Sequence, residues 1–271
     1  MLSRSRFLIF CSAAFLFAGA CSVSQALTID WDSVPWTNGS LINSLDVDPA
    51  RPGNDVTVTV SGDTALLQPE LASPNPQTPA VTRAFDGGLS PGQRTLSLAV
   101  NFTNQSQTIT VAVDFSAQYA QGVSNVSFTI FDVDFSNTSG NTYQDQISSI
   151  RAVGIDGSLI APIITTSANN TLSGTGLNQV VNGTVSTTDT GANSGRGNVT
   201  ISFGAAAIRS FTFTYGSGSG TVANPTYQHI GLHDITFTPV PEVNPALGAV
   251  FSCIGATLLV LRHNARNRRP R

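Results

Sequence analysis

DVTVTVSGD, at residues 55–63, alternates valine with threonine and ends in a Ser-Gly-Asp turn. Successive side chains of a β-strand point to opposite faces, so this pattern predicts a strand with one buried valine face. TLSLAVNFT at 95–103 and TITVAVDFS at 108–116 alternate in the same way. The polar NQSQ at 104–107 lies between them, and we expect the two strands to form a β-hairpin.

Further strand patterns follow along the chain. Asp156-Gly157 separates QISSIRAVGI from SLIAPII and predicts a second hairpin. NVTISF, SFTFTY and HIGLHDITF bring the total to about ten strands, with no helical period between Leu27 and Val240. Because Thr and Val are so frequent, the expected fold class is all-β. Residues 27–240 are predicted to form a single jelly-roll-like antiparallel β-sandwich.

Two stretches interrupt this regularity. The proline-rich LLQPELASPNPQTPAVTR at 66–83 predicts a long surface excursion or an edge strand, because prolines remove hydrogen-bond donors. In VSFTIFDVDF at 126–135 the apolar positions change face after Ile130. The strand is either buried on both sides or contains a bulge. We favour a bulge that turns Asp132 and Asp134 outward.

The composition excludes several classes of protein. All 13 basic residues of the 271 are arginine, and between residues 27 and 240 six arginines face fifteen acidic residues, giving a formal charge near −9. A nucleic-acid-binding domain needs a basic face, so no nucleic-acid partner is expected. The 41% hydrophobic content argues against disorder. Cysteine is absent between Cys21 and Cys253, which excludes a disulfide framework there.

Residues 1–26 have the three parts of a secretory signal peptide. Arg4 and Arg6 precede the apolar run FLIFCSAAFLFAGA, and the small residues Ser24 and Ala26 predict cleavage after Ala26. A lipoprotein signal with lipidation at Cys21 is the alternative, which we favour less. We therefore expect the chain to be exported.

The C-terminal end predicts a membrane segment. ALGAVFSCIGATLLVL at 246–261 carries no charge, and as a single helix its 16 residues would span ~24 Å, somewhat less than a bilayer core. Basic residues after it predict a cytoplasmic stop-transfer cluster, which leaves the middle of the chain outside; they are Arg262, Arg266, Arg268, Arg269 and Arg271. An ordinary tail anchor is the simplest interpretation.

The residues just before this segment add to that interpretation. Pro241, Glu242, Val243, Asn244 and Pro245, followed by the apolar run and the terminal arginines, resemble the PEP-CTERM sorting signal. The resemblance covers residues 241–271, and Val243 stands where the commonest form has a second proline. It implies an exported precursor that is held in the inner membrane of a Gram-negative bacterium. An exosortase-type processing enzyme then cuts near the Pro-Glu pair, and the product reaches the cell surface or the medium.

The middle of the chain has a resemblance of its own. DWDSVPWTNGSL at 30–41, FTIFDVDF at 128–135 and the later strand patterns are similar to the choice-of-anchor ectodomain of bacterial surface proteins. This implies a secreted β-sandwich with an undetermined ligand. The resemblance assigns no catalytic residues to this chain.

Three Asp-x-Asp pairs are the clearest candidates for chemistry, at 30/32, 46/48 and 132/134. Calcium takes six to eight oxygen ligands, and the best candidate set is Asp132, Asp134, Asp145 and Asp234. The spacing is not that of an EF-hand, and aspartate is also common in solvated turns. Calcium is therefore a possible cofactor rather than an established one.

Other chemistry has less support. Carboxylates at i and i+2 could approach the separation of a retaining glycosidase pair, but nothing else in the sequence supports an enzyme. On one strand, His229 and His233 would lie too far apart to share a metal. Some aromatic residues could stack on sugars, although core positions are commoner for them; they are Trp31, Trp36, Tyr143, Tyr215 and Tyr227.

The sequence therefore predicts an exported cell-surface or extracellular-matrix protein with a structural or adhesive role. The alternative is a carbohydrate-binding module, calcium-dependent or not, with extracellular polysaccharide as its partner. A polysaccharide-acting enzyme is the third and least favoured hypothesis.

Overall fold

The structure is a computed structural model that describes residues 24–71, 74–89, 93–138, 141–184, 191, 193–225 and 227–242. Residues 1–23 of the predicted signal peptide lie outside this part. So do Val243, Asn244 and Pro245 of the predicted sorting motif, the apolar run 246–261 and the arginine-rich tail 262–271. Within the described part, no helix is long and apolar enough to cross a membrane. Gln25–Val240 forms one compact unit.

The all-β prediction is confirmed. The described part of this unit contains strands and three short 3-10 turns, at Thr64–Leu66, Gly176–Asn178 and Gly195–Gly197. The strands are β1 (Leu27–Ile29), β2 (Ile42–Leu45), β3 (Val56–Gly62), β4 (Ala80–Thr82), β5 (Thr95–Val100), β6 (Thr108–Phe115), β7 (Val123–Phe131), β8 (Phe135–Thr138), β9 (Asn141–Gly154), β10 (Leu159–Ile160), β11 (Ile163–Thr166), β12 (Asn170–Ser173), β13 (Val180–Gly183), β14 (Val199–Ser202), β15 (Ile208–Ser217), β16 (Gln228–Leu232) and β17 (Ile235–Pro239).

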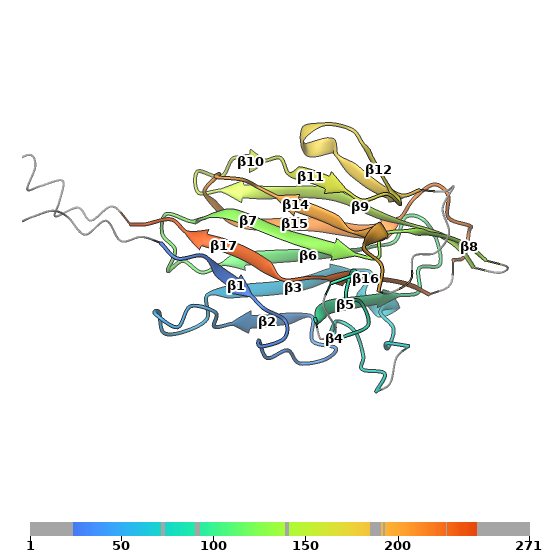
Figure 1. Cartoon of the computed structure of the whole chain (residues 1–271), viewed down its shortest axis with the longest axis horizontal. Helices are drawn as coiled ribbons and strands as arrows, with labels where there is room; N and C mark the ends of the chain where they lie inside the picture. Colours follow the sequence, from blue (N-terminus) through green and yellow to red (C-terminus); the bar gives the residue numbers. More distant parts are fainter. Residues whose placement is uncertain are drawn as a thin grey trace, which may run out of the picture. The chain divides into compact units, whose positions relative to one another are not determined.

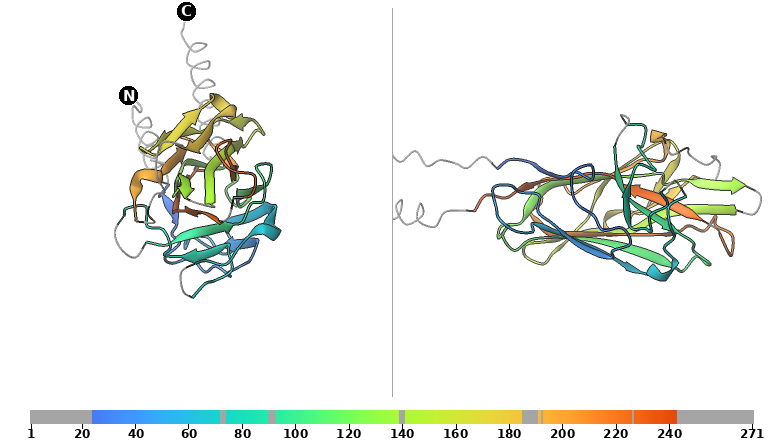
Figure 2. Two further views of the ribbon diagram at one scale, coloured as in Figure 1. Left: turned by 90° about the vertical axis from the view of Figure 1, so that its right-hand side faces the viewer. Right: turned by 90° about the horizontal axis from the view of Figure 1, so that it is seen from below.

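The described strands pair antiparallel and form one curled sheet (Figure 1). One group runs β2–β3–β6–β15–β9–β13–β12, with β8 and β10 also on β9. The other runs β4–β5–β16–β7–β14–β11, with β17 and β1 following on β7. A pairing of Ile208 in β15 with Val123 in β7 joins the two groups. Seen along the sheet, the strands lie in two layers (Figure 2, right).

One hydrophobic core lies between these layers. In β3, Val56, Val58 and Val60 are buried and the threonines between them are half-buried, as the alternation in the sequence predicts. The ring of Phe128 from β7 stacks on Phe211 from β15, with ring centroids 4.7 Å apart. Residues from both groups therefore meet in the same interior.

The predicted hairpin between residues 95–103 and 108–116 is wrong. Both segments are strands, but β5 pairs with β4 and β16, whereas β6 pairs with β3 and β15. Gln107 accepts hydrogen bonds from the backbone of Thr103 and Asn104, and Phe102 is fully buried in the core. The short connection therefore carries the chain from one layer to the other.

The second predicted hairpin is confirmed. Leu159 and Ile160 of β10 pair with Val153 and Ala152 of β9, and Gly157 has the positive φ of 85° that such a turn requires. HIGLHDITF, by contrast, is divided into β16 and β17, with the break between Leu232 and Ile235.

The expected outward turn of the carboxylates near residue 130 is also wrong. β7 ends at Phe131, and Asp132 adopts a left-handed backbone with φ of 65°. This conformation redirects the chain, but it carries Asp134 into the interior, where its exposed fraction is 0%. The backbone of Asp134 is bound to Asp145: the Asp145 N–H donates to the Asp134 carbonyl at 2.9 Å, and the Asp134 N–H donates to a carboxylate oxygen of Asp145 at 3.3 Å.

The chain enters and leaves this unit side by side. β1 pairs with β17, so that Leu27 lies opposite Phe237 (Figure 1). Just outside these strands, Ala26, Pro241 and Glu242 are exposed. The ordered sheet thus starts one residue after the predicted signal-peptide cleavage site and ends two residues before Pro241.

Candidate functional site

The proline-rich segment places Glu70 against Ser97 of β5 and His229 of β16. It runs along the edge of β5, where the Gln68 N–H donates to the carbonyl of Ala99 and β4 pairs with β5. It was predicted to be an excursion or an edge, and the edge position is confirmed. The contact of Glu70 with Ser97 contributes to the burial of all six residues of β5, although the sequence alternates.

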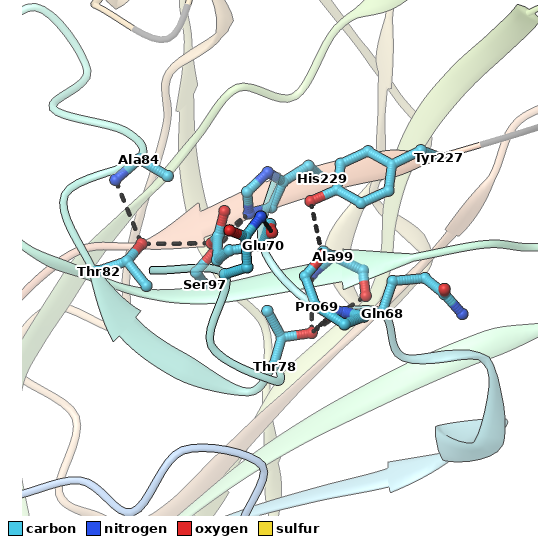
Figure 3. A network of polar contacts seen from close by, with 11 residues as sticks. Gln68, Pro69, Glu70, Thr78, Thr82, Ala84, Ser97, Ala99, Tyr227 and His229 are labelled. Atoms are coloured by element: carbon cyan, nitrogen blue, oxygen red, sulfur yellow. Dashed lines mark hydrogen bonds and ion pairs between the residues drawn. The ribbon is translucent and has the colours of Figure 1, made fainter. Parts of the chain in front are cut away.

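Under this cover, three polar side chains from distant parts of the chain meet (Figure 3). The Nε2 atom of His229 lies 2.9 Å from Oε1 of Glu70, and the Ser97 hydroxyl contacts both groups. Glu70 and Ser97 are buried, and the His229 side chain is only 11% exposed. β5 and β16 position two of them, because His229 lies opposite Ala99 and Ser97 is two residues away along β5.

The charge on Glu70 is stabilised by this arrangement. Burial by itself would raise the pKa of the Glu70 carboxyl, but hydrogen bonds from His229, Ser97 and Thr82 and the charge of His229 lower it below its ordinary value of 4.5. The cluster therefore holds an ionised carboxylate in a mostly buried place.

The proton arrangement argues against Ser97 as a nucleophile. A carboxylate only accepts hydrogen bonds, so the His229 Nε2 at 2.9 Å from Glu70 must carry a hydrogen. That same Nε2 faces Ser97. Serine nucleophiles need a base whose free nitrogen faces the hydroxyl, while the acid contacts the other ring nitrogen. The cluster is better suited to orienting Glu70 than to activating Ser97.

Glu70 also lines a surface pocket of about 400 Å³. Arg83, Arg94 and Thr82 contribute further polar groups, and Asn38 lies on the same wall. The remaining lining is small and apolar, from Pro74, Pro76, Val81 and Ala84. Pockets of this size that combine apolar walls with a few polar groups are common ligand sites.

Asp32 holds the two arginines of this pocket. Its Oδ1 lies 3.8 Å from a guanidinium nitrogen of each of Arg83 and Arg94, and its Oδ2 accepts a hydrogen bond from the Arg94 backbone at 3.1 Å. The first Asp-x-Asp pair is therefore part of the pocket's surroundings. Asp32 in turn has its own N–H bound to Oδ1 of Asp30, which closes a local turn.

Three of the four predicted calcium ligands lie near one another. Asp145 Oδ1 accepts a hydrogen bond from the Tyr215 hydroxyl at 2.7 Å. Burial raises the pKa of Asp145 well above its usual range, and the charges of Asp134 and Asp132 raise it further, whereas the Tyr215 bond lowers it. Calcium binds ionised carboxylates, so burial of Asp145 opposes binding unless the ion offsets it.

The fourth predicted ligand, Asp234, lies in another place. Its Oδ1 accepts a hydrogen bond from the Trp31 backbone at 3.1 Å, and its other oxygen lies 3.8 Å from His233. Among the described residues, no group of three or more His, Cys, Asp or Glu side chains is arranged to hold a metal ion. Calcium binding stays a prediction, and no metal-binding cluster among the described residues supports it.

The aromatic residues considered for sugar stacking are divided between the core and its border. Trp31 and Tyr215 are fully buried, and Tyr143 is 8% exposed. Trp36 is half-buried and packs edge-on against Trp31, and Tyr227 is half-buried against the ring of His229. None of the five lines the pocket at Glu70.

Sequence reasoning missed this site. His229 was considered only as a metal ligand together with His233, and Ser97 was treated only as part of a strand. One signal was available: Glu70 is the only glutamate between residues 27 and 240, and it stands in the proline-rich stretch that breaks the strand pattern. Comparison of the chain with models of protein families, with curated proteins and with solved structures finds no match.

Proposed function

We propose that this chain is an exported surface or extracellular-matrix protein with a structural or adhesive role, whose β domain is delivered by a removable C-terminal sorting signal. An export machinery and an exosortase-type processing enzyme would be its partners, and the inner membrane would hold the precursor. The motif from Pro241 to Pro245 and the arginine cluster after residue 261 support this proposal.

The observation that carries it is the placement of the two predicted processing sites. Ala26 and Pro241 are exposed and lie just outside the compact unit's first and last strands. Because β1 and β17 pair with each other, cutting at both sites would leave the sheet complete. A cut inside β1 or β17 would instead remove the pairing that closes this edge.

For the fold of the delivered domain, we propose a jelly roll. β5 pairs with β16, β6 with β15 and β7 with β14, so the pairings are nested around the middle of the chain. Four strands of one layer lie in the order β5–β16–β7–β14. Four strands of the opposite layer lie in the order β6–β15–β9–β13. Eight strands in two such sheets are what a jelly roll contains.

A structural or adhesive role is supported by the outer face of the β3–β6–β15 layer. Hydroxyl side chains pair between neighbouring strands, Thr110 of β6 with Thr214 of β15 at 3.1 Å and Ser44 of the adjacent β2 with Thr57 of β3 at 3.0 Å. Asp114 of β6 is exposed on the same face, opposite Thr57 and Ser210, so the face combines hydroxyls with a carboxylate and suits contact with hydrated neutral surfaces better than with a polyanion.

The intact mass of the protein recovered from the cell surface or medium tests the proposal. We expect a product that begins at Leu27 and ends between Val240 and Pro245. A product that retains Arg271 and is found only in the inner membrane would show a plain tail anchor, and the sorting proposal would be wrong.

A further inference from the structure

We propose that the pocket beside Glu70 binds one or two units of a neutral, hydroxyl-rich sugar. This deepens the adhesive role proposed above by naming a site and a ligand class. It does not depend on sorting, because the pocket lies in the β domain whether or not the tail is removed.

The shape of the pocket fits a small polar ligand. Its volume of about 400 Å³ is within the usual range for small-molecule sites. Pro74, Pro76, Val81 and Ala84 form an apolar wall against which the C–H groups of a sugar ring can pack. Two hydrogen bonds hold the backbone of Glu70 in this wall: its N–H donates to the carbonyl of Pro76 at 2.9 Å, and its carbonyl accepts from the Asn75 side chain at 2.8 Å. A wall held in this way loses little freedom on binding.

The charges around the pocket balance. The two lining arginines, Arg83 and Arg94, are both paired with Asp32, and Glu70 contributes a second carboxylate that His229 contacts from outside the lining. The domain as a whole carries a formal charge near −9 between residues 27 and 240, from six arginines and fifteen acidic residues. A polyanionic ligand would be repelled by the domain and would find no net positive charge in the pocket. A neutral ligand avoids both costs.

The polar groups complement hydroxyls, which donate and accept hydrogen bonds at once. Guanidinium groups supply donors, and their ion pairs with Asp32 are 3.8 Å long and exposed, so that redirecting them costs little free energy. Glu70 supplies the acceptor. The bonds described for its carboxylate, from Ser97, Thr82 and His229, all end on Oε1. We assign Oε2 to the sugar.

His229 and Ser97 are positioning residues in this scheme. They keep the carboxylate ionised and fix its orientation through their contacts with Oε1 (Figure 3). Phe85 packs edge-on against His229, with ring centroids 4.2 Å apart, and so limits the movement of the imidazole. A buried, oriented acceptor of this kind gives specificity for a donor at one defined place.

The test is isothermal titration calorimetry on the full chain, purified in a detergent that has no sugar headgroup. The probes are short oligosaccharides of glucose, mannose and galactose, with oligoglucuronate as the polyanion. The variants are Arg83→Gln and Glu70→Gln, and Arg151→Gln is the matched control, because Arg151 is exposed on β9 opposite Thr212. Thermal melting of Glu70→Gln shows whether that variant is folded.

We expect at least one neutral oligosaccharide to bind. Each pocket variant should raise its Kd by about tenfold or more, the usual loss for a hydrogen bond to a charged group. Arg151→Gln should bind as the unaltered chain does. Binding of oligoglucuronate more tightly than every neutral oligosaccharide would overturn the assignment of a neutral ligand. Equal binding by Arg83→Gln and the unaltered chain would overturn the location, and absence of binding to every neutral probe would overturn the proposal. None of these results would alter the mass of the processed product, so the sorting proposal is judged separately.

Discussion

Replacement of Phe211 by alanine tests whether the two strand groups enclose one packed interior. The ring of Phe211 is fully buried, stacks on Phe128 at 4.7 Å with an interplanar angle of 16°, and lies 5.8 Å from Phe203 and 6.4 Å from Phe115. Removing a buried phenylalanine side chain typically costs about 3–5 kcal/mol of unfolding free energy. Domains have only about 5–15 kcal/mol in total. For a domain of this length the loss corresponds to roughly 6–20 °C in melting temperature.

The assay is urea unfolding followed by the fluorescence of Trp31, which is fully buried. Thr212→Ala is the matched control, because Thr212 is the next residue on β15 and lies on its outer face, opposite Ala112 and Arg151. Its effect should stay within about 0.5 kcal/mol. Phe211→Leu should cost less than Phe211→Ala, since more of the side-chain volume is kept. If Phe211→Ala were no more costly than Thr212→Ala, the assignment of these faces to interior and exterior would be refuted.

Three further results are expected. Gly183→Ala should lower the unfolding free energy, measured in urea, by about 1–3 kcal/mol, because the added Cβ would lie 1.9 Å from the carbonyl oxygen of Asp134. Gly191→Ala is the control and should have almost no effect, because no atom lies within 4 Å of its added Cβ. Equal losses in the two variants would contradict the geometry. For Glu70→Gln, urea unfolding between about pH 3 and pH 7 should show a pH-dependent difference from the unaltered chain. The pKa of Glu70 is lowered from 4.5 in the folded state, so the ionised carboxylate stabilises the fold above about pH 4.5. This stabilisation is lost as the pH falls through the folded-state pKa. A difference between the two proteins that stays constant with pH would disprove this role of Glu70. If calcium binds, a calcium concentration one hundred times its Kd should add about 2.7 kcal/mol to the unfolding free energy. The Asp145→Asn variant should lose this gain. An unchanged melting temperature on calcium addition would reject the hypothesis.

The strands were predictable where their residues alternate. β3 and β6 follow the Val/Thr pattern, since a half-buried strand needs only a local period of two residues. β5 has a similar pattern but is buried on both faces, and Glu70, from a segment far away along the chain, packs against its Ser97. No local period contains that information.

The candidate site was not predictable in the same way. Glu70, Ser97 and His229 come from a proline-rich segment, an inner strand and a late strand, and only pairing of β16 with β5 brings the last two together. The calcium prediction shows the same limit. Asp132, Asp134 and Asp145 do approach one another, whereas Asp234 lies with Trp31 and His233.

By itself, the sequence determined the fold class, the faces of the alternating strands and the turn at Asp156-Gly157. Each depends on residues close together in the chain, where side-chain period and backbone preference act directly. The tertiary structure alone decided which strands distant in the chain pair with one another and where the carboxylates lie. β5 and β6 are joined by a short polar connection and still pair with other strands, and from two different layers the apolar residues of both are buried in the same core, which no local pattern of residues specifies.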